Sequence, residues 1–187
     1  MALTISGTSN GSLNNLSLSA NTGDILDTKN TTFFGIDVFR PTTTLLAPSG
    51  VITNYTRATD IGFAKIGTGM TVSSGVFTFP STGIYLVGLK IEVLLRDNDQ
   101  NAIVNTEMTQ DNSSYTDIGR ALCGNGASPI ITTNAFSQSI VDVTDTSLVK
   151  VRFNCISFRS DSGNQSSLQS NPAQDFTSMT FQRLGDT

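Results

Sequence analysis

The stretch that decides the fold is GVFTFPSTGIYLV, residues 75–87. Its first half alternates apolar and polar side chains, a pattern typical of a β-strand with one buried face. Pro80 then ends the strand at a position that needs no donor to the sheet ladder, and Gly83 permits a tight start to the next strand. Tyr85 can bury its ring while its hydroxyl stays near the wet end of the sheet. The stretch therefore predicts two successive strands joined by a short turn.

The same two-residue period continues on both sides of this stretch. Runs of alternating residues are separated by clusters of Asn, Asp, Gly and Pro, and no run of about 10 residues shows the 3.6-residue period of a helix. We expect residues 159–175, which are strongly polar, to form an exposed loop at one end of the molecule. The pattern predicts an all-β, antiparallel sandwich or jelly roll. The expected strands are residues 33–39, 61–66, 72–79, 83–95, 102–109, 116–123, 130–143, 147–158 and 176–184.

Length and charge restrict the class of protein. The chain has 187 residues and a mass of 19.9 kDa, which suits one domain with an extension. Its 11 Lys and Arg against 15 Asp and Glu give a net charge of −4, so it lacks the dense cationic patch that nucleic acid or an anionic membrane requires. No apolar run approaches the roughly 18 residues of a membrane span, and the first residues do not read as a signal peptide. We therefore expect no nucleic-acid partner and no membrane insertion.

The composition gives little support for catalysis. Without histidine, the chain cannot use imidazole as a general base, a triad member or a metal ligand. Glu92 and Glu107 are the only glutamates, and nothing places them about 5–10 Å apart across a cleft, as a glycosidase requires. Cys123 and Cys155 fit no zinc spacing, so we expect two small buried side chains, with a disulfide as the alternative. The prediction is a protein that is not an enzyme and has no cofactor.

Two polar loops are candidates for a metal or sugar site. Asp97 and Asp99 crowd one loop and Asp111 another, and calcium prefers such oxygen ligands. Asx side chains also form turns by hydrogen bonding to their own backbone, and we prefer this local role, so no metal site is assigned. Tyr115 lies in a loop-like stretch beside Asp and Asn. We keep it as a candidate ligand contact that can stack on a sugar, against the alternative that it packs within the protein.

The first 32 residues differ from the rest of the chain. They combine small polar residues with seven Leu and Ile, and contain no aromatic residue. Such a segment cannot bury enough apolar surface by itself to offset about 1–2 kcal/mol of backbone entropy per ordered residue. We expect an arm that orders against a partner, with disorder as the alternative. The residues expected to bind that partner are Leu3, Ile5, Leu13, Leu16 and Leu18.

Residues 75–87 also resemble a known family signature. A Gly, an aromatic-x-aromatic pair, a Pro and then Gly-x-Tyr opening a long strand are similar to the globular heads of complement-type collagenous proteins, which share the tumour necrosis factor jelly roll. Residues 137–151 and 176–184 resemble the later hairpin and the closing strand of that family. The resemblance implies a jelly-roll head, residues 33–187, preceded by the arm, residues 1–32.

The same resemblance implies a homotrimer, because such heads turn one apolar sheet face towards their neighbours around a threefold axis. The Phe-rich residues 33–39 and 176–181 add to this expectation. They carry more aromatic surface than we expect one small sandwich to need inside.

The arm and the polar last residues, 184–187, are similar in style to structural proteins of tailed bacteriophages. We therefore expect a non-enzymatic structural protein of a bacteriophage particle surface, either a capsid decoration or a tail fibre or spike component. It would be assembled in the host cytoplasm and lie on the virion surface, with the head projecting and the arm bound to other virion proteins. A host surface glycan is a further candidate partner. The alternative is a free carbohydrate- or receptor-binding module of complement-head type, and a glycan-cleaving enzyme is a third hypothesis.

Overall fold

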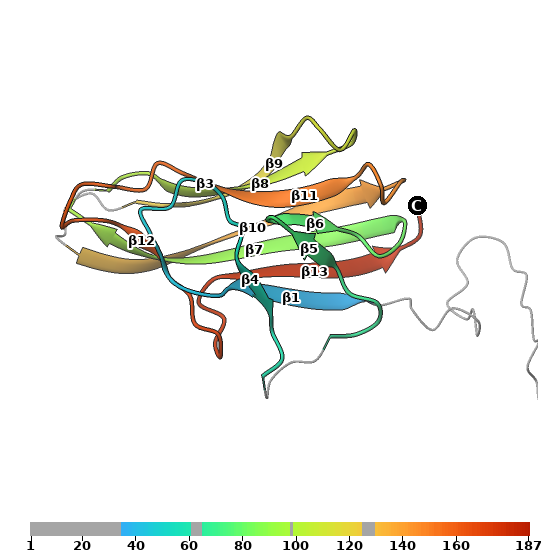
Figure 1. Cartoon of the computed structure of the whole chain (residues 1–187), viewed down its shortest axis with the longest axis horizontal. Helices are drawn as coiled ribbons and strands as arrows, with labels where there is room; N and C mark the ends of the chain where they lie inside the picture. The colour runs from blue at the N-terminus through green and yellow to red at the C-terminus, as the bar shows by residue number, and fades with distance from the viewer. Residues whose placement is uncertain (1–34, 61–64, 98, 125–129) are drawn as a thin grey trace, which may run out of the picture.

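The structure is a computed structural model and describes residues 35–60, 65–97, 99–124 and 130–187. These residues form thirteen strands in two sheets that face each other, and every strand pairing is antiparallel (Figure 1). Among them there is no helix long and apolar enough to span a membrane. The expected arm, residues 1–32, and the first two residues of the expected head lie outside the described residues.

The larger sheet has seven strands. Strands β13 and β12 pair with one edge of β7, at residues 84–90 and 93–94, and β10 pairs with its other edge. Beyond β13 the sheet continues with β1 and β4, and beyond β12 with β2. Their bounds are β1 Ile36–Pro41, β2 Leu45–Leu46, β4 Tyr55–Arg57, β7 Gly83–Arg96, β10 Ile130–Val143, β12 Ser167–Leu168 and β13 Ser178–Gly185.

The smaller sheet has six strands. They run in the order β5-β6-β11-β8-β9, and β3 also pairs with β11. Their bounds are β3 Gly50–Val51, β5 Thr71–Ser73, β6 Val76–Thr78, β8 Ala102–Thr109, β9 Thr116–Cys123 and β11 Lys150–Ile156. Strands β9 and β10 lie at the same edge of the sandwich, where the Ser139 hydroxyl donates to the Ile118 carbonyl at 3.0 Å. This contact joins the two sheets along that edge.

Alternate residues of the central strands fill the core between the sheets. In β7 every second side chain from Tyr85 to Leu95 is buried, while Leu86, Lys90, Glu92 and Leu94 between them are half-buried on the outer face. An aromatic cluster fills the end near the β6–β7 turn, with the Phe77 and Phe181 ring centroids 4.8 Å apart. The Phe79 and Tyr85 centroids lie 4.7 Å apart in the same cluster. Each Å² of apolar surface buried between the sheets contributes about 25 cal/mol, and this burial is the main force that holds the sheets together.

The deciding stretch forms its expected turn. Gly83 has a φ of +138°, and a Cβ at this position would lie 2.5 Å from the Gly185 carbonyl oxygen, so only glycine fits. The Tyr85 ring is buried and its hydroxyl donates to the Ser81 carbonyl at 3.0 Å. The prediction of one strand over residues 72–79 is wrong, because Ser74 and Gly75 both have positive φ and make a two-residue turn between β5 and β6. The Ser-Gly dipeptide is the turn signal that the alternation concealed.

Other expected elements differ in their bounds. The prediction of a strand over residues 61–66 is not confirmed: residues 61–64 lie outside the described residues, and Ile66 forms only an isolated bridge to Ile36. The strand expected over residues 147–158 is shorter, as β11. Strands β2, β3 and β4 were not expected, because Pro and Gly punctuate residues 41–57.

The prediction that residues 159–175 form an exposed loop is wrong in the middle of the segment, residues 166–168, while residues 160–163 and 172–175 are exposed as expected. Ser166 and Leu168 are buried, and Leu168 in β12 pairs with Val93 of β7. The Ser166 hydroxyl accepts a hydrogen bond from the Arg96 backbone N–H at 3.1 Å. The polar composition of the segment gave no sign of this burial, because the buried serines form hydrogen bonds with backbone groups and add little apolar area.

Candidate functional site

The outer face of the seven-stranded sheet carries an exposed apolar patch. Phe136 and Ile140 of β10 are 62% and 60% exposed. The β10–β7 register places Ile140 opposite Leu86, and Gln138 opposite Gly88. A Cβ at Gly88 would lie 4.0 Å from the Phe136 ring, so the ring lies close to bare backbone. We call Phe136, Ile140, Leu86 and Gly88 the β10 patch.

One argument for the predicted homotrimer, the Phe-rich segments 33–39 and 176–181, is not supported by the described strands. The expected surplus of surface aromatics does not exist in the described strands, because Phe39 and Phe181 are buried in the core of their own chain. Among the described residues, the large aromatic side chain that is exposed is instead Phe136. The sequence contained a signal for it: Phe136 and Ile140 share their strand phase with the polar Gln138 and Asp142, so a face expected to be polar carries two large apolar side chains.

Tyr115, the candidate ligand contact, packs against its own chain. The Arg152 guanidinium lies 3.7 Å from the centroid of the Tyr115 ring, on the outer face of the six-stranded sheet. Arg152 Nε also donates to Glu107 Oε2 at 2.5 Å, and Asn154 Nδ2 donates to Glu107 Oε1 at 2.7 Å. Burial raises the pKa of the Tyr115 hydroxyl. One face of the ring is therefore already occupied, which favours the packing role over sugar stacking.

The two glutamates do not form a catalytic pair. Glu92 lies on the outer face of the seven-stranded sheet and Glu107 on the outer face of the six-stranded sheet. Stacked sheets lie about 10 Å apart, so side chains on opposite outer faces are separated by the whole sandwich. Glu107 is also held by Arg152 and Asn154. This placement does not provide the shared cleft that glycoside cleavage needs.

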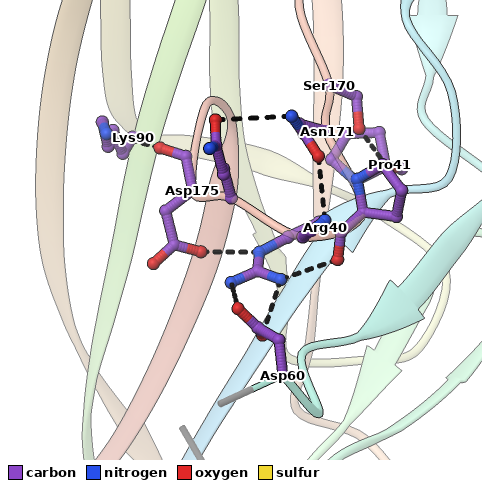
Figure 2. Close-up of polar contacts among 10 residues, drawn as sticks. Arg40, Pro41, Asp60, Lys90, Ser170, Asn171 and Asp175 are labelled. Carbon is purple, nitrogen blue, oxygen red and sulfur yellow. Dashed lines mark hydrogen bonds and ion pairs between the residues drawn. The ribbon is translucent and has the colours of Figure 1, made fainter. Parts of the chain in front are cut away.

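A buried arginine, Arg40, is held by two carboxylates and a backbone carbonyl. The Arg40 side chain is 3% exposed and donates to Asp60 Oδ1 at 2.9 Å, Asp175 Oδ1 at 2.6 Å and the Pro172 carbonyl at 2.9 Å (Figure 2). Lys90 Nζ donates to the backbone carbonyl of Asp175 at 2.5 Å. Burial lowers the pKa of Arg40, but the hydrogen bonds and charges of the two aspartates outweigh it and raise the pKa overall. The guanidinium thus binds β1 to two distant segments of its own chain.

The carboxylates of the 97–99 loop bind N–H groups. Asp99 accepts the backbone N–H of Arg159 at 3.0 Å and that of Asn101 at 3.4 Å. The Asp97 carboxylate accepts the Asn164 side-chain amide. No group of three acidic, Cys or His side chains clusters in the described part of the chain. The Asn101 contact is the local turn role preferred for these residues. The contacts with Arg159 and Asn164 join residues 60 and 67 positions apart, and the sequence did not predict them.

Cys123 and Cys155 are free and buried, as predicted. They lie on the two strands that flank β8, where Cys123 pairs with Ala102 and Cys155 with Val104. Burial raises the pKa of Cys123 to about 11 and that of Cys155 to about 12. Thiols held in the protonated form by burial are poor nucleophiles and poor metal ligands.

A pocket of about 310 Å³ opens at the end of the sandwich where β1 begins and β13 ends. Its buried lining comes from Met70, Tyr85 and Phe181, while Ile66 on its wall is 52% exposed. Gly35, the first described residue, is also part of the lining. This pocket was not predicted from the sequence, because its lining comes from four separate segments within residues 35–37, 66–70, 80–85 and 181–186. The other predicted site residues, Leu3, Ile5, Leu13, Leu16 and Leu18, lie outside the described residues.

Solved structures share this arrangement of strands. Eiger TNF from S. frugiperda has a TM-score of 0.59 and 14% identity, over 82% of this chain and 94% of that one. Murine APRIL at pH 5.0 has a TM-score of 0.56 and 12% identity, over 81% and 99% of the two chains. The globular domain of zebrafish complement 1qA protein has a TM-score of 0.52 and 9% identity, over 82% and 98%. No protein-family model matches the chain, and no curated protein sequence matches it significantly.

The chain therefore has the jelly-roll fold shared by tumour necrosis factor and the complement globular heads. The predicted all-β, antiparallel jelly roll is confirmed, and so is the fold part of the resemblance carried by residues 75–87. Identities of 9–14% establish the fold alone, because one fold hosts many functions. Assembly and function have to be argued from the surfaces of this chain.

Proposed function

We propose that this chain is the non-enzymatic, homotrimeric head of a bacteriophage particle surface, either a capsid decoration or a tail fibre or spike component. The head would project from the virion, and the arm, residues 1–32, would anchor it to other virion proteins. The observation that carries the self-association is the β10 patch. The setting on a phage particle is supported by the Leu/Ser/Asn-rich arm and the polar last residues.

The β10 patch is suited to burial against further copies of the chain. Phe136 is the most exposed aromatic residue of the described strands, and exposed apolar patches on soluble proteins mark interaction sites. Lys90 lies opposite Phe136 in the register and Glu92 lies opposite Asn134, so charges of both signs border the patch. A surface with both signs can complement a rotated copy of itself. The resemblance to tumour necrosis factor-like jelly rolls implies that an apolar sheet face of this kind lies at a threefold axis.

The lack of enzymatic activity is supported by the composition and by the two glutamates. The chain has no histidine, and Glu92 and Glu107 lie on opposite outer faces, with Glu107 ion-paired to Arg152 at 2.5 Å. We expect no turnover of glycans or esters. Product formation that is abolished by Glu92→Gln or Glu107→Gln would contradict this part of the proposal.

Light scattering at micromolar concentration tests the trimer. The molar mass measured for the full-length protein should be three times the chain mass of 19.9 kDa. Phe136→Asp should dissociate it, because burying an unpaired charge at a packed interface is costly. Leu122→Asp is the matched control, since Leu122 is 47% exposed on the opposite outer face of the sandwich. A monomeric wild-type chain, or a Phe136→Asp variant that stays trimeric, would refute the assignment of the β10 patch.

Deletion of residues 1–32 tests the anchor. The truncated head should fold and trimerise but fail to join the particle, because the apolar residues expected to bind virion partners are lost. Normal incorporation would show that the arm is not the anchor. Such a result would favour the alternative of a free carbohydrate- or receptor-binding module.

A further inference from the structure

The pocket at the β1–β13 end has the chemistry of a seat for an aromatic side chain. Its floor is formed by Met70, Tyr85 and Phe181, each at most 3% exposed, and Ile36 and Ile66 line its wall. Its volume of about 310 Å³ exceeds the roughly 150 Å³ that holds a benzene ring in an engineered core cavity. The proposed trimer and anchor make no use of this space.

The charged groups of the pocket already have partners. Asp37 Oδ2 accepts the Met70 backbone N–H at 2.8 Å, and Arg57 Nε donates to Asp37 Oδ1 at 2.8 Å. Arg183 donates to the Thr82 carbonyl at 3.2 Å and is paired with Asp186. No orphaned buried polar atom of the described residues lies in the lining. The buried end of the pocket, at Met70, Tyr85 and Phe181, therefore favours an apolar occupant rather than an ion or a strongly polar ligand.

Two aromatic residues directly precede the pocket lining in the sequence. Gly35 lines the pocket, and Phe33 and Phe34 directly precede it. Two residues of extended chain span about 7 Å, so both rings are within reach. Successive side chains of an extended chain point to opposite faces, so only one of the two can enter. Phe39 faces the core, and the two-residue period from Phe39 through Asp37 and Gly35 reaches Phe33.

We propose that this pocket seats the ring of Phe33 of the same chain, fixing the root of the arm to the β1–β13 end of the head. Seating the ring would cover the exposed Ile66 and contact Met70. It would also set the point and direction in which residues 1–32 leave the head. The proposal does not depend on the trimer or on the particle setting.

The methyl NMR signal of Met70 tests the seat in the full-length chain labelled at methionine methyl groups. The signal is assigned by its loss in Met70→Leu. Removing an adjacent aromatic ring removes its ring-current contribution, so Phe33→Ala should shift the Met70 signal and lower the melting temperature. Phe34→Ala, the matched control one residue away, should leave the Met70 signal in place. An unchanged signal in Phe33→Ala, or a shift in Phe34→Ala alone, would overturn the proposal.

Two further variants keep the test decisive. If Phe33→Ala does not fold, Phe33→Leu should fold and still shift the Met70 signal, because the ring current is lost while much of the volume is kept. A full-length chain with Leu3, Ile5, Leu13, Leu16 and Leu18 changed to Ser should leave the Met70 signal unchanged. A shift in that variant would assign the pocket to the arm of this or a neighbouring copy and refute the assignment to Phe33.

Discussion

Arg40 and Asp175 lie 135 positions apart in the sequence and form an ion pair with an Nε–Oδ1 distance of 2.6 Å. The same guanidinium holds Asp60 at 2.9 Å, so one buried cation joins β1 to two other segments. When one aspartate is removed, Arg40 keeps the other as a carboxylate partner. When both are removed, the buried guanidinium charge has no carboxylate partner. Mutations within one ion-pair network are not additive for this reason.

We expect the double variant Asp60→Ala/Asp175→Ala to lose more stability than the two single variants added together. Chemical denaturation of the four proteins, wild type included, measures this difference. The exposed pair Arg120–Asp117, with an N–O distance of 3.9 Å, provides the control cycle and should show little coupling. Additive losses in the Arg40 cycle would mean that the guanidinium remains solvated without its aspartates.

Acid should weaken the fold through three aspartates. Hydrogen bonds from Arg40 lower the pKa of Asp60, the backbone N–H of Ser114 and further donors lower that of Asp111, and hydrogen bonds from Ser147 lower that of Asp145. A carboxyl with a depressed folded-state pKa stabilises the fold above its unfolded pKa of about 3.9. That stabilisation is lost as the pH falls through the folded-state value.

We therefore expect the melting temperature to fall as the pH decreases below about 4. Asp111→Asn should be less stable than wild type at pH 7. The difference should shrink as the pH falls below about 4, because the unfolded wild-type chain then takes up a proton at Asp111 while the depressed pKa keeps the folded carboxylate ionised. Melting curves at several pH values measure this. A difference that stays constant down to pH 2.5 would show that the charge of Asp111 contributes nothing.

The fold was predictable where the strands are long. Strands β7, β8, β9 and β10 each have eight or more residues and appear in the structure within a residue or so of their expected bounds. Two-residue strands such as β2 and β12 have no period of their own, and they exist because Leu168 pairs with Val93 and with Leu45. Pairings across such sequence separations are not encoded locally.

The candidate sites were harder to predict for the same reason. The Arg40 network and the pocket each collect side chains from segments scattered between residue 35 and residue 186. The patch around Phe136 was within reach, since its apolar residues break the polar phase of β10. Tyr115 was placed correctly in a loop, but its stacking partner Arg152 lies on a strand far along the chain.

The two thiols should be unreactive in the native protein. Burial raises the pKa of Cys123 to about 11 and of Cys155 to about 12, so almost no thiolate exists at pH 8, and both side chains are buried. Thiol titration with an aromatic disulfide should detect no free thiol in buffer and two in denaturant. A native chain that reacts at once, or a denatured chain without free thiols, would contradict the buried, unbridged state.

Truncation of the paired aromatic residues of the deciding stretch should disrupt the core. Phe79 and Tyr85 are 2% and 3% exposed, and replacing a buried aromatic residue by alanine costs roughly 3–5 kcal/mol, a large part of a domain's stability of about 5–15 kcal/mol. Phe79→Ala and Tyr85→Ala should therefore unfold at markedly lower denaturant concentrations. Tyr115→Ala, which removes a half-exposed ring stacked on Arg152, should lose far less. Equal midpoints for all three variants would mean that the strand phase of β6 and β7 is misassigned.

The turn into β7 should tolerate no side chain at Gly83. An alanine there would place its Cβ 2.5 Å from the Gly185 carbonyl oxygen, a backbone atom that cannot swing away, and would need a φ of +138° that L-residues rarely adopt. Gly83→Ala must therefore separate β7 from the end of β13 or distort the turn. Gly185→Ala is the matched control, because a Cβ at Gly185 meets no heavy atom within 4 Å. We expect a clear drop in melting temperature for Gly83→Ala and near-wild-type melting for Gly185→Ala. Similar melting of the two variants would show that β13 can move away from Gly83 at little cost, so that the close contact between the two glycines does not hold this end of the sandwich together.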